Sequence, residues 1–145
     1  MTKPASFYIG IKSVIVNVNL NKTLVLLKID QLGRQYWDIP GGRINDGENP
    51  EDTLERELQE EIVNIGKNYT IKQFLSNFRL NRVLNDGNGL FLIFYKVETD
   101  LEFIELSLEH LSYKWVSLED LSLLEQDSST YIESGYLKAL KQALE

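Results

Sequence analysis

The distribution of hydrophobic and polar residues predicts several short strands in the first third of the chain. β-Branched residues partly alternate with polar ones at 13–18, and a similar pattern resumes at 23–27. The polar residues between these runs predict a hairpin near Asn21 and Lys22. A further short strand is expected at 37–39, before a proline and a pair of glycines that favour a turn.

The central part of the chain predicts a second hairpin. Residues 69–82 and 90–95 have strand-like composition, and the run 85–89 between them is rich in Asn, Asp and Gly, which favour turns. Another short strand is expected at 113–116. Since no internal repeat, low-complexity tract or linker is visible, residues 1–145 are predicted to form a single domain.

Helical signals occur in the middle and at the end of the chain. Asn49 before Pro50 is typical of a helix start, and the helix is predicted to run from about Pro50 to Val63. Ser117 with Asp120 predicts one capped helical turn, and residues 131–144 repeat apolar positions at helical spacing. Strands that flank an internal helix and precede a C-terminal helix indicate a mixed α/β domain.

Seven carboxylates and one basic residue, Arg56, lie in the fourteen positions from 48 to 61. Three of these carboxylates are spaced i, i+3 and i+4 and therefore share one face of the predicted helix: Glu57, Glu60 and Glu61. Their mutual repulsion favours a compensating positive charge, such as a divalent cation. The alternative is a solvated acidic helix, but such helices usually mix both signs of charge, and this one has no lysine.

Composition narrows the classes of function. The net charge of −7 argues against long nucleic acid as a partner but is compatible with a small polyphosphate. The absence of cysteine excludes disulfides, thiolate metal sites and a cysteine nucleophile. Neither a signal segment nor a membrane span is visible, so no membrane association is expected and a cytoplasmic location is the default.

The acidic helix and the loop before it match a known motif. The pattern is Gly42, five residues, Glu48, seven residues, then Arg56-Glu57-Leu58-Gln59-Glu60-Glu61, preceded by Trp37 and Pro40-Gly41-Gly42. It resembles the Nudix box of the Nudix hydrolase family. The resemblance implies an α/β/α sandwich with a mixed β-sheet, a catalytic loop-helix and a C-terminal helix. It also implies Mg²⁺-dependent hydrolysis of a diphosphate linkage in a nucleoside triphosphate or dinucleoside polyphosphate, with Mn²⁺ as a substitute metal.

The same resemblance assigns roles to individual residues. Glu57, Glu60 and Glu61 should bind the metal, together with the backbone carbonyl of Gly41. Glu48 and Arg56 should form an ion pair that orients the loop against the helix. The catalytic candidates are Glu48, Arg56, Glu57 and Glu60. Either Glu57 or Glu60 is expected to act as the general base.

Candidate residues outside the metal face are less sharply defined. Arg43 follows the glycine pair and is the best placed of four basic candidates for phosphate contact, the others being Lys28, Arg79 and Arg82. Residues 106–115 resemble a stretch of Nudix polyphosphate hydrolases in which a glutamate binds a further metal or acts as base, which makes Glu109 a candidate. His110 and the two tryptophans, Trp37 and Trp115, are expected to have structural roles.

One position departs from the family pattern, because Val63 stands where a glycine usually follows the box. A β-branched residue resists the left-handed conformation of a helix end, so the sequence predicts a later cap at Asn64 or Gly66. Two alternative functions stay open: cleavage of a nucleotide-sugar, and nucleotide sensing without turnover. The protein is expected to be a monomer or a homodimer.

Overall fold

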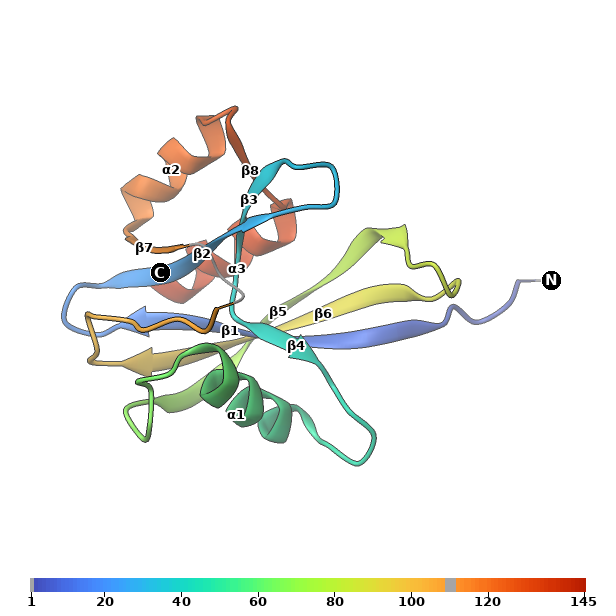
Figure 1. Cartoon of the computed structure of the whole chain (residues 1–145), viewed down its shortest axis with the longest axis horizontal. Helices are drawn as coiled ribbons and strands as arrows, with labels where there is room; N and C mark the ends of the chain where they lie inside the picture. Colours follow the sequence, from blue (N-terminus) through green and yellow to red (C-terminus); the bar gives the residue numbers. More distant parts are fainter. Residues whose placement is uncertain (1, 109–111) are drawn as a thin grey trace.

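The computed structural model describes residues 2–108 and 112–145 of the chain. The described residues form one mixed sheet flanked by helices on both faces (Figure 1). The strands are β1 Phe7–Asn17, β2 Lys22–Ile29, β3 Gln35–Asp38, β4 Gly41–Arg43, β5 Thr70–Val83, β6 Gly89–Thr99, β7 Ser112–Val116 and β8 Thr130–Ile132. The helices are α1 Pro50–Glu61, α2 Leu118–Gln126 and α3 Ser134–Leu144.

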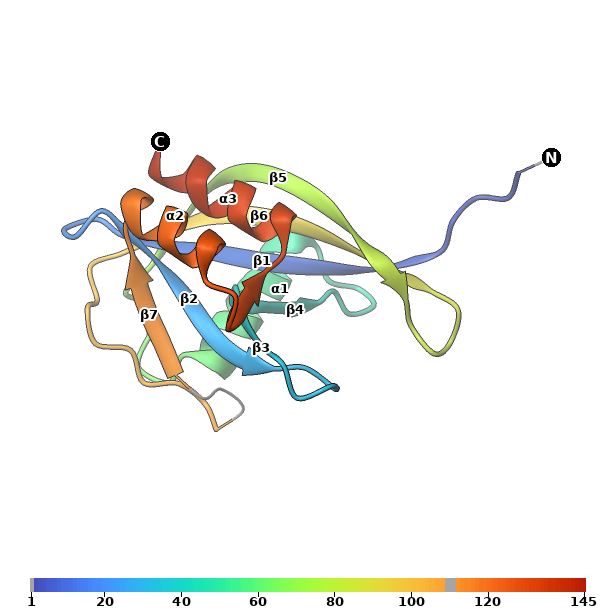
Figure 2. The ribbon, with the colours of Figure 1, turned by 90° about the horizontal axis from the view of Figure 1, so that it is seen from above.

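Strand β1 connects the two parts of the sheet, whose main order is β5-β6-β1-β2-β3-β8. It pairs with β6 in parallel along its whole length, whereas β2 joins only its C-terminal end, at Val16 and Asn17. Strand β4 pairs with the middle of β1. Because β1 shares so little of its length with β2, strands β2, β3 and β7 diverge from β1, β5 and β6 (Figure 2).

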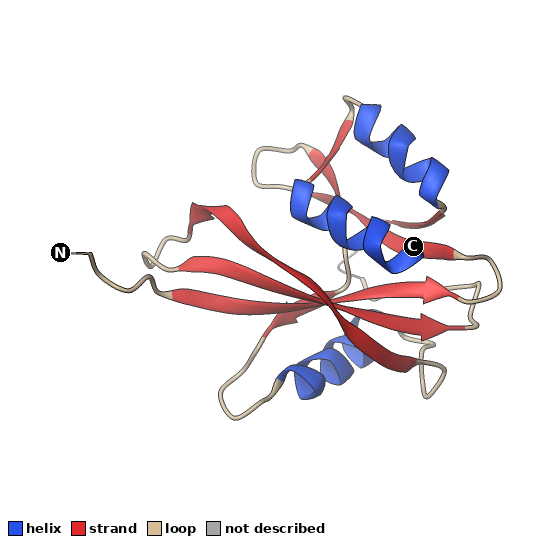
Figure 3. Cartoon of the chain, turned by 180° about the vertical axis from the view of Figure 1, so that it is seen from behind, coloured by secondary structure: helices blue, strands red, loops and turns tan. Residues whose placement is uncertain are grey.

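Alternation along β1 explains the two layers of core. Ile15 points to the face covered by α1, where it packs with Leu58 and Ile62, while its neighbours Val14 and Val16 pack on the opposite face. Helices α2 and α3 cover that second face (Figures 1 and 3). The predicted α/β/α sandwich with a mixed sheet and a C-terminal helix is therefore confirmed. No helix in the described part of the chain is long and apolar enough to cross a membrane.

Helix α1 begins where the sequence predicted, at Pro50, and the backbone N–H of Asn49 donates to the Asp52 carboxylate at 3.1 Å. Its predicted continuation to Val63 is wrong, because the helix ends at Glu61 and Ile62 is extended. The chain beyond it pairs with another segment: Ile62 bridges Leu106, and the Val63 N–H donates to the Glu105 carbonyl at 2.7 Å.

Val63 therefore escapes the conformation that a β-branched residue resists. Among the described residues other than glycine, a positive φ occurs at Asn21 in the first hairpin, at 52°, and not at Val63. Gly66 has a φ of 51° but lies in a turn after the helix, so neither it nor Asn64 is the cap. The pairing of residues 105–107 with the end of α1 replaces the later cap that the sequence predicted at Asn64 or Gly66.

Candidate active site

The glycine pair lies between strand β1 and helix α1, too close to both for any side chain. A Cβ added at Gly41 would lie 2.2 Å from the carbonyl oxygen of Ile11, and one added at Gly42 would lie 2.1 Å from Oε1 of Glu57. Gly41 also has a φ of 155°, which L side chains rarely adopt. Glycine at both positions allows the loop to approach the acidic helix closely.

The three glutamates expected to bind metal differ strongly in exposure. Glu61 is buried, with 6% of its surface exposed, and its carboxylate accepts the backbone N–H of Gly41 with N···O distances of 3.3 Å to each oxygen. The Glu57 side chain is 14% exposed and that of Glu60 is 59% exposed. The acidic face thus extends from the interior to the solvent, with Glu57 between the other two in accessibility.

Arg56 holds this face and the preceding loop together, as the predicted ion pair with Glu48 requires. Its Nε and Nη2 donate to the two Glu48 oxygens at 2.8 and 3.0 Å, and Nη2 also donates to the Arg43 carbonyl at 3.0 Å. Nη1 donates to Glu57 at 2.7 Å and lies 3.7 Å from a Glu60 oxygen. One guanidinium therefore contacts three carboxylates and the loop backbone, a geometry suited to its planar set of donors.

The pKa values of two carboxyl groups bound by Arg56 are shifted in opposite directions. Hydrogen bonds from Arg56 and from the backbone N–H of Asn45 lower the pKa of Glu48 to about 2. Burial raises the pKa of Glu57, against the hydrogen bond from Arg56, and the charges of Glu61 and Glu60 add to the rise. Glu57 thus carries a negative charge at an electrostatic cost that a nearby cation would remove.

The donor chemistry of this loop and helix fits a hard divalent cation. Carboxylate and backbone carbonyl oxygens are the ligands that Mg²⁺ prefers, and the charges of Glu60 and Glu61 are close enough to Glu57 to affect its pKa. Within residues 2–108 and 112–145, no three Asp, Glu or His side chains are already gathered as a metal-holding group. The assignment of Gly41, Glu57, Glu60 and Glu61 as ligands stays a prediction.

Comparison with known proteins decides the family. The family model described as "NUDIX domain" matches residues 11–134. The chain belongs to the NUDIX domain family. A curated 8-oxo-dGTP diphosphatase of Proteus vulgaris is 59% identical over 27 residues, a match that covers 19% of this chain and 24% of the relative. Family membership, together with a relative named as a diphosphatase, supports a hydrolase.

Solved structures with the same fold cover nearly the whole chain. The MutT protein of Methanosarcina mazei Go1 superimposes with a TM-score of 0.72 and 19% identity, covering 99% of this chain and 96% of that one. A possible asymmetric diadenosine tetraphosphate hydrolase of Jonesia denitrificans gives 0.73 and 18%, covering 95% and 92%. The dihydroneopterin triphosphate pyrophosphohydrolase of E. coli gives 0.69 and 17%, covering 96% and 94%. At these identities the likeness supports the Nudix fold alone.

The predicted substrate-binding residues of this Nudix domain are only partly brought to the site. Arg43 has its backbone carbonyl bonded to Arg56, while its guanidinium lies 4.5 Å from the centre of the Tyr8 ring. Arg79 packs similarly over Phe7, at 4.8 Å. The candidate Glu109 and its neighbour His110 lie outside the described residues. Trp37 and Trp115 are partly buried against the two core clusters, as expected of structural aromatics.

Sequence reasoning missed a second charged cluster beside the Nudix box. Lys12 on β1 and Lys28 on β2 both contact the buried carboxylate of Asp38 on β3, at 3.1 and 2.8 Å. Asp38 lies three residues before Gly41, and Lys12 pairs with Gly41 in the sheet. The available signal was a lysine within the apolar pattern of β1, but its partners come from strands distant in sequence.

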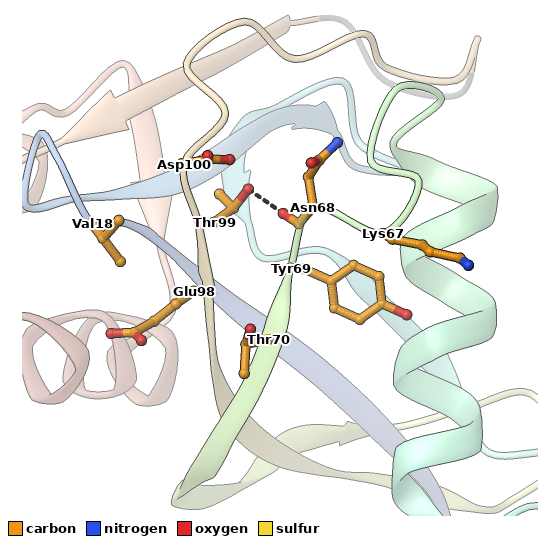
Figure 4. Close-up of a pocket in the computed structure, with 8 residues that line it drawn as sticks. All are labelled: Val18, Lys67, Asn68, Tyr69, Thr70, Glu98, Thr99 and Asp100. Atoms are coloured by element: carbon orange, nitrogen blue, oxygen red, sulfur yellow. Dashed lines mark hydrogen bonds between the residues drawn. The ribbon is translucent and has the colours of Figure 1, made fainter.

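A separate surface pocket contains none of the predicted site residues. It lies beyond the C-terminal ends of β1 and β6, where Thr99 donates a hydrogen bond to the Asn68 carbonyl at 2.5 Å (Figure 4). The residues that line it are Val18, Lys67, Asn68, Tyr69, Thr70, Glu98, Thr99 and Asp100. The candidate active site is therefore the loop and helix of the Nudix box.

Proposed function

We propose that this Nudix domain hydrolyses a diphosphate linkage in a nucleoside triphosphate or a dinucleoside polyphosphate. The products are a nucleotide and a phosphate or pyrophosphate fragment, and the metal is Mg²⁺, with Mn²⁺ able to replace it. The observation that carries the proposal is the loop and helix of the Nudix box, in which Arg56 joins Glu48, Glu57 and the loop backbone. Members of this family generally use a divalent metal.

The residues of the box divide the work of the reaction. Glu57, Glu60 and Glu61 would hold the cation with the Gly41 carbonyl, and Arg56 and Glu48 keep the loop in place against the helix. The bound cation supplies charge neutralisation for the phosphoryl oxygens and lowers the pKa of a water. Glu57 or Glu60 would accept a proton from this water as the water oxygen bonds to phosphorus and the bridging P–O bond breaks. Arg43 and Glu109 are the residues proposed to contact substrate.

The proposal is tested by measuring the products of a nucleotide panel with Mg²⁺, by mass spectrometry in ¹⁸O-labelled water. We expect release of a nucleotide and a phosphate fragment, and the label identifies the attacked phosphorus. Glu60→Gln and Glu61→Gln should each reduce kcat/KM by at least about 100-fold, in the range of a lost catalytic group. The matched control is Glu55→Gln on the exposed side of the same helix, which should keep wild-type rates.

Three outcomes would overturn the proposal or part of it. Full activity in both variants would remove the metal-binding role of these glutamates. Tight, metal-dependent binding of a polyphosphate without turnover would identify a nucleotide-sensing domain, and preferential cleavage of a nucleotide-sugar would change the substrate class. A cytoplasmic location and a monomeric or homodimeric state stay predictions, which fractionation of cells and light scattering would test.

A further inference from the structure

Two lysines and one aspartate from three different strands meet beside the Nudix box. Lys12 Nζ lies 3.1 Å from Asp38 Oδ1, and Lys28 Nζ lies 2.8 Å from Asp38 Oδ2. The Asp38 side chain is 4% exposed, and those of Lys12 and Lys28 are 11% and 27% exposed. We call these three side chains the lysine–aspartate cluster. Together they carry one net positive charge in a largely buried position.

The two lysines differ in how many of their ammonium N–H donors are engaged by neighbouring groups. Lys12 donates both to Asp38 and to the Ile39 carbonyl at 3.0 Å, and its ammonium lies 5.7 Å from the centre of the Tyr136 ring. Lys28 is more exposed, and its ion pair with Asp38 engages one of the three N–H donors of an ammonium. Lys28 is therefore the member that can reach a ligand, while Lys12 is fixed within the protein.

The cluster lies next to the proposed metal ligands. Asp38 lies three residues before Gly41, and the side chain of Lys12 runs so close to Gly41 that a Cβ there would lie 2.8 Å from Lys12 Cδ. The charge of Glu61 is close enough to Lys28 to influence its pKa. A positive group next to the carboxylate face can attract the same polyphosphate that a bound cation would contact.

Other groups around Lys28 point to the same region. Lys28 pairs with Tyr36 across β2 and β3, so the two side chains share one face of the sheet. Burial raises the pKa of Tyr36, and the charge of Asp38 adds to the rise, against the charges of Lys28 and Lys12. Lys28, one of the basic residues singled out from the sequence, thus lies next to an aromatic ring on this face.

We propose that Lys28, held by Asp38, contacts a phosphate group of the substrate's polyphosphate chain next to the Nudix box. This inference rests on the proposed function and deepens it by naming a recognition residue outside the motif. An ammonium with one donor engaged by a carboxylate offers the others to phosphate oxygens. The competing explanation is that the cluster only ties β1 to β2 and β3. That explanation predicts a loss of stability on mutation, without a specific loss of phosphate affinity.

The decisive variant is Lys28→Met, which keeps the length of the side chain and removes its charge. We expect KM for the best polyphosphate substrate to rise about 10- to 100-fold, the range of one lost charge-assisted contact, with kcat changed less than about threefold. Lys28→Arg keeps the charge and should recover most of the affinity. The matched control is Lys72→Met on β5, which removes a strand lysine that also has a carboxylate neighbour, Glu98 at 3.5 Å.

A second measurement separates binding from turnover. Calorimetric titration with inorganic triphosphate and Mg²⁺ should show the same 10- to 100-fold loss of affinity in Lys28→Met and none in Lys72→Met. Unchanged KM and triphosphate affinity in a folded Lys28→Met protein would overturn the inference. If the wild-type protein hydrolyses no polyphosphate at all, the proposed function fails instead, and the titration alone then decides whether Lys28 binds phosphate.

Discussion

The Arg56 contacts and the lysine–aspartate cluster are charge networks of opposite composition that both lie next to the glycine pair, with Glu57 close to Gly42 and Lys12 close to Gly41. In the first, one cation joins Glu48, Glu57 and Glu60, with the outermost carboxylate exposed to solvent. In the second, two cations share one carboxylate in a nearly buried position. The first network leaves a surplus of negative charge and the second a surplus of positive charge. This difference suits the proposed site, in which a cation would bind at the first network and phosphate at the second.

Burial should make the lysine–aspartate cluster the more sensitive of the two networks to mutation. Asp38→Asn removes the charge that Lys12 and Lys28 share and leaves two ammonium groups close together. Breaking a buried pair by removing one partner costs about 3 to 5 kcal/mol, so the free energy of unfolding should fall by that amount. Urea denaturation followed by tryptophan fluorescence measures it. A loss below 1 kcal/mol would mean that water screens the cluster and that its burial has little energetic effect.

The two networks also differ in how far the sequence reveals them. The Arg56 contacts lie within one loop and one helix, so the resemblance to the Nudix box was enough to predict the ion pair of Glu48 with Arg56. The lysine–aspartate cluster requires the pairing of β1 with β4 and of β2 with β3, which no local pattern encodes. Asp38 was visible before Pro40-Gly41-Gly42, but nothing in the sequence identified its two partners.

The same distinction applies to the fold. The start of α1, the two hairpins and the C-terminal helix follow from local signals, such as Asn49 before Pro50. Strands β4 and β8 have three residues each and were not predicted, and the single capped turn expected at Ser117 extends into the nine-residue helix α2. The end of α1 was misplaced because residues 105–107, far along the chain, supply its hydrogen-bond partners.

Acid should affect the Arg56 network through Glu48. Its pKa in the folded state is about 2, below the ordinary value of 4.5, so its contribution to stability is complete above pH 4.5 and disappears as the pH falls toward 2. Glu48→Gln should therefore be less stable than wild type at pH 6, with the difference shrinking between pH 4.5 and 2. Thermal melts across this range measure the effect. A difference that does not depend on pH would show that Glu48 acts through packing and not through its charge.

The smallest expected effect comes from a hydrogen bond that an uncharged hydroxyl donates to the Arg56 network. Thr53 is fully buried, and its hydroxyl donates to Glu48 Oε1 at 3.1 Å. Thr53→Val keeps the shape of the side chain and removes the donor, and Arg56 and the Asn45 N–H still bind the same carboxylate. Because Glu48 stays well bonded, the loss of stability should be about 1 kcal/mol, with kcat/KM within about twofold of wild type. A loss of activity as large as that of Glu60→Gln would instead show that small shifts of Glu48 reach the metal face, and that the loop before α1 has to be positioned precisely for catalysis.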